Sequence, residues 1–206
     1  MKGMNKMITM TDKVENRFRV DVKKLKSKRD ILTNVHYTKD GHIEMTNGFI
    51  AIRLKDVHDQ EESLKHGKNT DEEYPNLDHI FSDDFQSTNS FITTLHTKQM
   101  EDFIETFKSN KPDKITVNFL KSNNSIILTM LKENHLQNEA QCTLHNQFEN
   151  EKNTQIHFTY HYLLIVFKFI RMLGVEKVEC YQKHENAPVN LVYKNLHVII
   201  MPVRKN

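Results

Sequence analysis

The chain has 206 residues, of which 37% are hydrophobic and 27% are charged, a composition typical of one large or two small globular domains. No apolar run approaches the roughly 18 residues that a membrane-spanning helix needs, and the first residues lack the apolar centre of a secretory signal, so we expect a cytoplasmic protein that does not contact a membrane. The formal net charge is +2, but basic residues prevail in residues 1–60 and acidic residues in residues 61–110. The basic part suits a polyanionic partner, and the alternative is a charge pattern that only serves solubility.

The residue types that usually carry catalysis or bind metals form no recognisable motif. The sequence contains no HExxH, no paired CxxC and no aspartate cluster, and its five glycines form no phosphate-binding loop. Cys142 and Cys180 lie far apart in sequence, which favours buried thiols in a reducing compartment over a disulfide or a metal site. The sequence thus predicts no catalytic residue, no metal and no cofactor, and it disfavours a hydrolase or nuclease.

The N-terminal part is predicted to contain a strand, a short segment of doubtful helicity and three more strands. They fall at residues 18–22, 25–32, 35–38, 42–46 and 49–54. Residues 58–73 are polar and charged with few large apolar side chains, which indicates a mobile loop. We therefore predict a partial domain over residues 1–73, which includes this acidic loop, and an interdomain linker over residues 74–90.

Residues 91–206 are predicted to form a complete second domain built from two similar halves, each a strand, a helix and three strands. In the first half, a helix at residues 98–109 carries one apolar stripe: Met100, Phe103, Ile104 and Phe107. Its strands are expected at residues 91–97, 115–119, 126–128 and 140–144. The second half has a helix at residues 162–173, closed by Gly174, and strands at residues 156–160, 175–181, 189–193 and 197–203. The repeated β-α-β-β-β pattern indicates an α+β fold of antiparallel sheets packed on helices. The alternative is an arbitrary α+β domain whose halves match by chance.

Four segments, in this order, carry a family resemblance. They are HIEMTNGFIAIRL at residues 42–54, EYPNLDHIF at 73–81, the strand-helix segment at 156–181 with its Tyr162-Leu163 pair, and VIIMPVRKN at 198–206. The chain resembles the bacterial DNA polymerase sliding clamp, the β subunit of the replicase, which has a TDGHRLA-type strand, a [FY]PD…RV linker and a C-terminal MP[MV]R. The resemblance implies a DNA-clamp fold of repeated β-α-β-β-β units. It also implies a shortened member, because family chains have six such units and close a ring as dimers. We therefore expect a homo-oligomer with more subunits, or a ring that does not close.

In the family, three of these motifs converge on a groove that binds short extended peptides of polymerases and clamp-loader proteins. The resemblance thus implies a partner-peptide site formed by Thr46, Gly48, Pro75, Ile80, Met201, Pro202, Val203 and Arg204. Gly48 is expected to allow a close backbone approach, Met201 to adapt to several ligands, and Arg204 to pair with a peptide oxygen. The sequence departs from the family at Asn47, Phe49, Ile50 and His79, which predicts altered specificity or a filled pocket. Alternatively, residues 201–203 are only the last core strand.

A second expected function is non-specific contact with double-stranded DNA, because clamp helices present basic side chains to phosphates. His161, Lys168 and Arg171 share one face of the second helix. A stronger basic patch is expected from Lys23, Lys24, Lys26, Lys28 and Arg29. The first helix argues against contact, since its polar face carries Glu101, Asp102 and Glu105. The alternative for each basic stripe is a solvated surface.

The sequence therefore favours a sliding-clamp-like processivity factor that tethers a DNA polymerase or other replication proteins to DNA. A rival interpretation is a clamp mimic that binds clamp partners or a host clamp and regulates replication without encircling DNA. A third is a generic α+β interaction domain. The abundance of Lys, Asn and Ile suggests an AT-rich genome, such as that of a low-GC bacterium or its phage.

Overall fold

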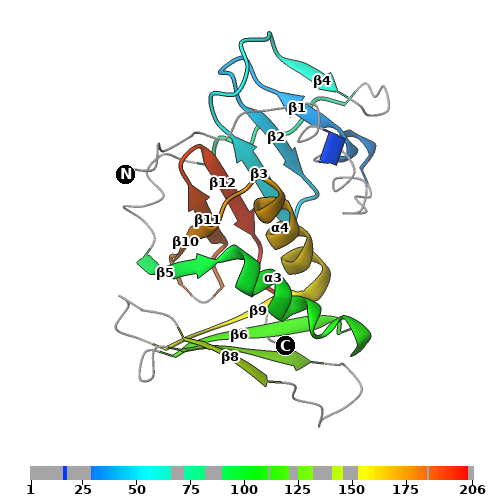
Figure 1. Cartoon of the computed structure of the whole chain (residues 1–206). Coiled ribbons are helices and arrows are strands. Elements are labelled where there is room, and N and C mark those ends of the chain that lie inside the picture. Colours follow the sequence, from blue (N-terminus) through cyan, green and yellow to red (C-terminus); the bar gives the residue numbers. More distant parts are fainter. Residues whose placement is uncertain are drawn as a thin grey trace, which may run out of the picture. The chain divides into compact units, whose positions relative to one another are not determined.

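The computed structural model describes residues 16–17, 29–65, 72–81, 90–110, 112–120, 125–131, 141–145, 153–184 and 186–203. The chain forms two compact units, whose elements are labelled in Figure 1. Unit 1 comprises Met1–Phe81 with Val192–Val198, and unit 2 comprises Ser82–Leu191 with Ile199–Asn206. None of the described helices is both long and apolar enough to cross a membrane.

Unit 1 is an antiparallel sheet with strand order β4-β1-β2-β3-β12. Its elements are η1 (Asp30–Thr33), β1 (Val35–Tyr37), β2 (Ile43–Thr46), β3 (Ile50–Leu54), β4 (Ser63–Lys65) and the unit-1 part of β12 (Leu196–Ile200). Every residue of β1, β2 and β3 is buried, so both faces of these strands are covered, which is unusual for an antiparallel sheet with polar alternation. The segment predicted as a loop at residues 58–73 contains β4, and the predicted strand at residues 18–22 lies outside the described residues.

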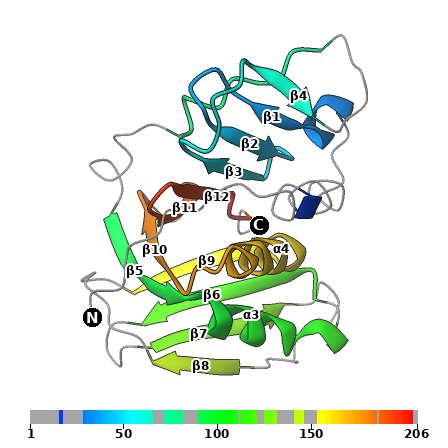
Figure 2. The same cartoon turned by 45° about the horizontal axis from the view of Figure 1, so that its top comes forward.

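The described residues of unit 2 form two α-helices and two groups of antiparallel strands. The helices are α3 (Thr97–Glu105) and α4 (Tyr160–Met172), and a short η2 (Lys108–Asn110) follows α3. One sheet has the order β8-β7-β6-β9, from β8 (Gln141–His145), β7 (Ser125–Leu131), β6 (Lys114–Leu120) and β9 (Thr154–Thr159). The other strands are β5 (Ser90–His96), β10 (Lys177–Gln182) and β11 (Val189–Tyr193), in the order β11-β10-β5. Figure 2 shows α3 and α4 side by side over one face of the four-stranded sheet.

The predicted β-α-β-β-β repeat is confirmed as β5-α3-β6-β7-β8 and β9-α4-β10-β11-β12. The predicted apolar stripe of α3 is buried, each residue at most 4% exposed: Met100, Phe103, Ile104 and Phe107. Gly174 follows α4 with a positive φ of 76°, as a helix-closing residue should. Several boundaries differ by one or more residues. Helix α3 ends at Glu105 rather than 109, α4 begins two residues earlier than predicted, and β12 ends at Ile200 rather than 203.

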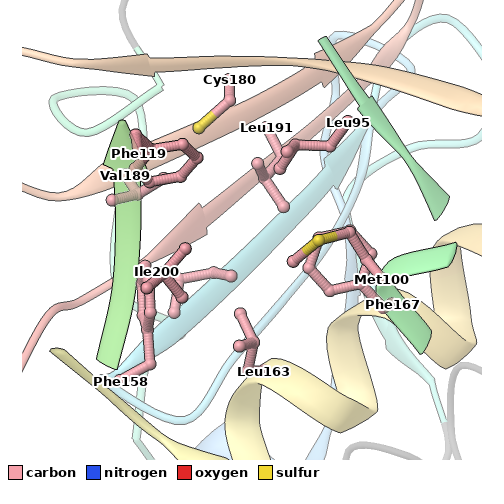
Figure 3. Close-up of a pocket in the computed structure, with 11 residues that line it drawn as sticks. Leu95, Met100, Phe119, Phe158, Leu163, Phe167, Cys180, Val189, Leu191 and Ile200 are labelled. Atoms are coloured by element: carbon pink, nitrogen blue, oxygen red, sulfur yellow. The ribbon is translucent and has the colours of Figure 1, made fainter. Parts of the chain in front are cut away.

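The core of unit 2 is apolar and close-packed, as Figure 3 shows for eleven residues around its centre. They come from α3, α4 and strands of both groups: Leu95, Met100, Val117, Phe119, Phe158, Leu163, Phe167, Cys180, Val189, Leu191 and Ile200. The space left between them is only about 10 Å³, about the smallest cavity that could hold one water molecule. Since its lining is entirely apolar, this space belongs to the packed core and offers no ligand a polar contact.

Candidate partner-binding and nucleic-acid-facing surfaces

The predicted TNG motif forms the tight turn between β2 and β3. The Asn47 side chain accepts hydrogen bonds from the backbone amides of Phe49 (2.9 Å) and Ile50 (2.8 Å), and the Thr46 hydroxyl donates to the Ile50 carbonyl (2.7 Å). Gly48 has a φ of 88°, where an L side chain is disfavoured. A Cβ at Gly48 would meet nothing within 4 Å. Within unit 1, this glycine therefore supplies the left-handed turn, and the close approach of a partner's backbone stays a prediction.

The two residues that replace the family's His-Arg pair lie in different environments. Phe49 is 55% exposed at the tip of the turn, whereas Ile50 is 1% exposed and belongs to the core. Only Phe49 therefore adds apolar surface to this end of the hairpin. Asn47 is 7% exposed and holds the turn, so its replacement of aspartate keeps an acceptor for the same local bonds.

Residues 74–81 form a turn whose apolar side chains anchor it to unit 1. Leu77 and Phe81 are buried, and the Leu77 carbonyl accepts the backbone amides of Ile80 (3.0 Å) and Phe81 (3.1 Å). Pro75 and Ile80, both predicted site residues, are half-buried. Both therefore stay partly accessible in a segment that Leu77 and Phe81 anchor.

A row of buried ionisable side chains, which was not predicted from the sequence, holds this segment to the hairpin. His36, Glu44 and Arg53 are paired across β1, β2 and β3. Arg53 Nε donates to Glu44 Oε1 (2.6 Å), and Arg53 Nη2 donates to Asp78 Oδ1 (2.6 Å). The Arg53 guanidinium also lies 4.6 Å from the centre of the Phe81 ring, a distance typical of cation–π contact. In the sequence, Glu44 and Arg53 occupy the polar positions of alternating strands, a pattern that does not reveal that they are partners.

The C-terminal motif lies beyond the last core strand. Strand β12 ends at Ile200, and Met201 is 40% exposed, while Pro202 and Val203 are half-buried. The Val203 amide donates to the His157 carbonyl (2.7 Å), which fixes the segment beside β9. The alternative that residues 201–203 are a core strand is therefore wrong. Arg204 lies outside the described residues.

The predicted site residues fall into both units. Thr46, Gly48, Pro75 and Ile80 belong to unit 1, and Met201, Pro202 and Val203 belong to unit 2. Within unit 1, the hairpin turn and the segment 74–81 are tied together by Arg53, Asp78 and Phe81. A common groove formed by all of these residues remains a prediction.

The basic side chains of α4 are paired with acidic side chains of α3. Lys168 Nζ lies 2.5 Å from Glu105 Oε1, and Arg171 Nη1 donates to Glu101 Oε2 (2.8 Å). The hydrogen bond and charge of Lys168 lower the pKa of Glu105, and those of Glu101 raise the pKa of Arg171. Glu101 is 8% exposed, so it faces Arg171 rather than solvent. Together α3 and α4 carry three basic and three acidic side chains, and these helices offer little net attraction to phosphate.

The second predicted DNA-contacting patch is described only at its end. Lys23, Lys24, Lys26 and Lys28 lie outside the described residues. Arg29 donates to Glu72 Oε2 (3.0 Å), and both side chains are about half exposed. Such an exposed pair contributes little to stability.

Solved structures that match this fold include bacterial sliding clamps. A DNA polymerase sliding clamp from Pseudomonas aeruginosa matches with a TM-score of 0.70 and 13% identity, over 93% of this chain and 65% of that chain. The Helicobacter pylori β clamp bound to a DNA ligase peptide matches with a TM-score of 0.70 and 11% identity, over 96% and 65%. The DNA polymerase III β subunit from Thermotoga maritima matches with a TM-score of 0.70 and 14% identity, over 95% and 65%.

The predicted resemblance is confirmed at the level of the fold, because identities this low show the fold alone. The chain spans about 65% of the length of these clamps. No protein-family model matches the sequence, and no curated protein matches it.

Proposed function

We propose that this chain, which has the sliding-clamp fold, is a non-enzymatic, cytoplasmic processivity factor that tethers a DNA polymerase or another replication protein to double-stranded DNA. The observation that carries the proposal is the match of 93% of the chain to a bacterial sliding clamp. Encircling DNA would require several copies of the chain, so the proposal includes a homo-oligomer. The domain division proposed is a partial clamp-like domain, residues 1–73, a linker, residues 74–90, and a complete clamp-like domain, residues 91–206.

The proposed ligand is a short extended peptide with leucine or phenylalanine anchors, carried by a polymerase or a clamp-loader-type protein. One clamp with this fold was solved with a DNA ligase peptide bound. The proposed site joins the hairpin turn, residues 75 and 80, and the C-terminal residues 201–204. In support, Met201 is one of three large hydrophobic side chains that are exposed in the described ranges, with Phe49 and Leu64. A flexible, exposed methionine suits a site that accepts several partners.

Replacing Met201 with alanine is expected to weaken peptide binding about ten-fold, the effect of losing one anchor contact of about 1.4 kcal/mol. The measurement is isothermal titration with a synthetic peptide that carries leucine and phenylalanine anchors, such as the DNA ligase segment. The matched control is Leu64→Ala, since Leu64 is 41% exposed and lies on β4, outside the proposed site. Equal affinity in wild type and Met201→Ala would exclude this segment from the site, and no binding at millimolar peptide would overturn the proposal.

A second candidate function is a clamp mimic that binds clamp partners and regulates replication without encircling DNA. The pairing of Lys168 with Glu105 and of Arg171 with Glu101 favours it. Phosphate would have to displace these carboxylates, which repel it at the same positions. The mimic needs only the peptide site.

Retention on nicked circular DNA separates the two candidates. For a processivity factor, we expect the protein to stay on the circle at moderate salt and to leave when the DNA is linearised, because topological linkage survives screening that weakens phosphate contacts. Light scattering of the free protein gives the oligomeric state in parallel. Peptide binding without any retention would select the mimic, and the absence of both would overturn both candidates.

A further inference from the structure

A polar cleft of about 240 Å³ lies in unit 1, between β1, β2 and the segment that carries Tyr74 and Asp78. Its volume is somewhat below that of a typical small-molecule pocket and is suited to a single long side chain. The proposed peptide site does not include it. The cleft is therefore a separate feature of the same unit.

The lining of the cleft is strongly acidic. Four carboxylates line it, from Asp40, Glu44, Glu62 and Asp78, against one lysine, Lys39. Glu44 is buried and engaged by Arg53, which also binds Asp78. Arg53 thus compensates part of this charge from outside the lining. The cleft retains an excess of negative charge that a cation would balance.

The remaining cationic partner inside the cleft is weakly held. Lys39 Nζ lies 3.8 Å from Glu62 Oε2, and the Lys39 side chain is 77% exposed. Glu62 Oε1 also lies 3.0 Å from His36 Nε2. An exposed pair at this distance contributes little, so a ligand cation can replace Lys39 beside Glu62 at small cost.

One wall of the cleft is aromatic. The rings of His36 and Tyr74 stack with centroids 4.5 Å apart and an angle of 27° between their planes. Burial, and then the negative charge of Glu44, raise the pKa of Tyr74, so the phenol stays neutral at physiological pH. A neutral ring beside carboxylates is the arrangement that favours a guanidinium or ammonium group with an alkyl stem.

We propose that this cleft binds the guanidinium or ammonium group of an arginine or lysine side chain presented by a partner protein. A metal ion is disfavoured, because the described residues contain no group of three or more His, Cys, Asp or Glu side chains placed to hold one. The inference stands on unit 1 alone and does not depend on clamp activity or on the peptide site.

The probe is Nα-acetylarginine amide, titrated into the full chain and followed by backbone amide NMR. The neutral isostere Nα-acetylcitrulline amide is the ligand control. We expect saturable shifts for arginine, centred on residues 36, 74 and 77, and none for citrulline. Glu62→Gln should weaken the arginine affinity about three-fold, the effect of removing one half-exposed charge. Glu61→Gln is the matched protein control, since Glu61 is exposed, adjacent and outside the lining.

Lys39→Gln is expected to have the opposite effect on affinity, because it removes the cation that competes for Glu62 and leaves every carboxylate of the cleft unchanged. We expect arginine to bind about two- to three-fold more tightly to this variant. The same change at Lys98, an exposed residue of α3 in unit 2, should have no effect. Three results would overturn the proposal. Glu61→Gln and Glu62→Gln could weaken arginine binding equally, the amide shifts could spread to residues near all surface carboxylates, or no saturable shift could occur at tens of millimolar probe.

Discussion

Replacing Arg53 with methionine is expected to lower the free energy of unfolding by about 3–5 kcal/mol, because it leaves a buried carboxylate without its cation. The Arg53 side chain is 5% exposed and that of Glu44 is 2% exposed. The same guanidinium binds Asp78 and lies over Phe81, so the segment 74–81 should loosen as well. Urea unfolding measures the loss, and hydrogen exchange of the β2 and β3 amides assigns it to unit 1.

Two further variants distinguish a stranded charge from simple loss of packing. Arg29→Met breaks an ion pair with Glu72 in which both side chains are about half exposed, and it should cost at most about 1 kcal/mol. The double variant Glu44→Met with Arg53→Met removes both charges and should recover at least half of the loss. A loss of unfolding free energy below about 1 kcal/mol for Arg53→Met alone would contradict the role of Arg53 as the partner of the buried Glu44 carboxylate.

The modules of unit 2 could be predicted from sequence because their signals are local. The stripe from Met100 to Phe107 follows helical spacing, and the flanking strands alternate. Phe107 lies past the end of α3 but is still buried, and its amide continues the helical turn by bonding to the Ile104 carbonyl (3.2 Å). Helix boundaries depend on the last few backbone hydrogen bonds, which side-chain spacing does not reveal.

The ionic row of unit 1 could not be predicted in the same way, because it depends on strand register. Glu44 and Arg53 each look like the solvent-facing positions of an alternating strand. Only the pairing of β2 with β3 makes them neighbours. Similarly, spacing along α4 grouped Lys168 with Arg171 correctly, but it could not show that α3 supplies the opposing carboxylates.

The end of β12 could have been predicted from the sequence. The predicted strand ran to residue 203 and thus through Pro202, which has no amide hydrogen to donate to a sheet. The chain leaves the strand at Ile200, and the Val203 amide bonds to the His157 carbonyl instead. The proline was therefore the boundary signal: the strand ends two residues before it, at Ile200, and the exposed Met201 that the proposed site requires lies between Ile200 and Pro202.

Cys180 is expected to resist thiol reagents in the folded protein and to react rapidly once unit 2 unfolds. It is 1% exposed among the apolar residues of Figure 3, and burial raises the pKa of its thiol from 9.0 to about 12. Because the thiolate is the reactive form, a rise of this size lowers its population at pH 8 about a thousand-fold. Iodoacetamide labelling of a Cys142→Ser variant, followed by mass spectrometry with and without urea, measures the ratio.

The same pKa shift fixes a direction for stability against pH. An unfolded chain releases the Cys180 proton from about pH 9, whereas the folded chain holds it until about pH 12. Stability from this group is therefore complete below pH 9 and falls as the pH rises between these values, since the unfolded state binds fewer protons there. Cys180→Ala removes the titrating group and should flatten that part of the profile, with Cys142→Ser as the common background. In the iodoacetamide experiment, equal labelling rates of Cys180 in native buffer and in urea would show that its thiol is accessible in the folded protein. The close packing described for the core of unit 2 would then be wrong.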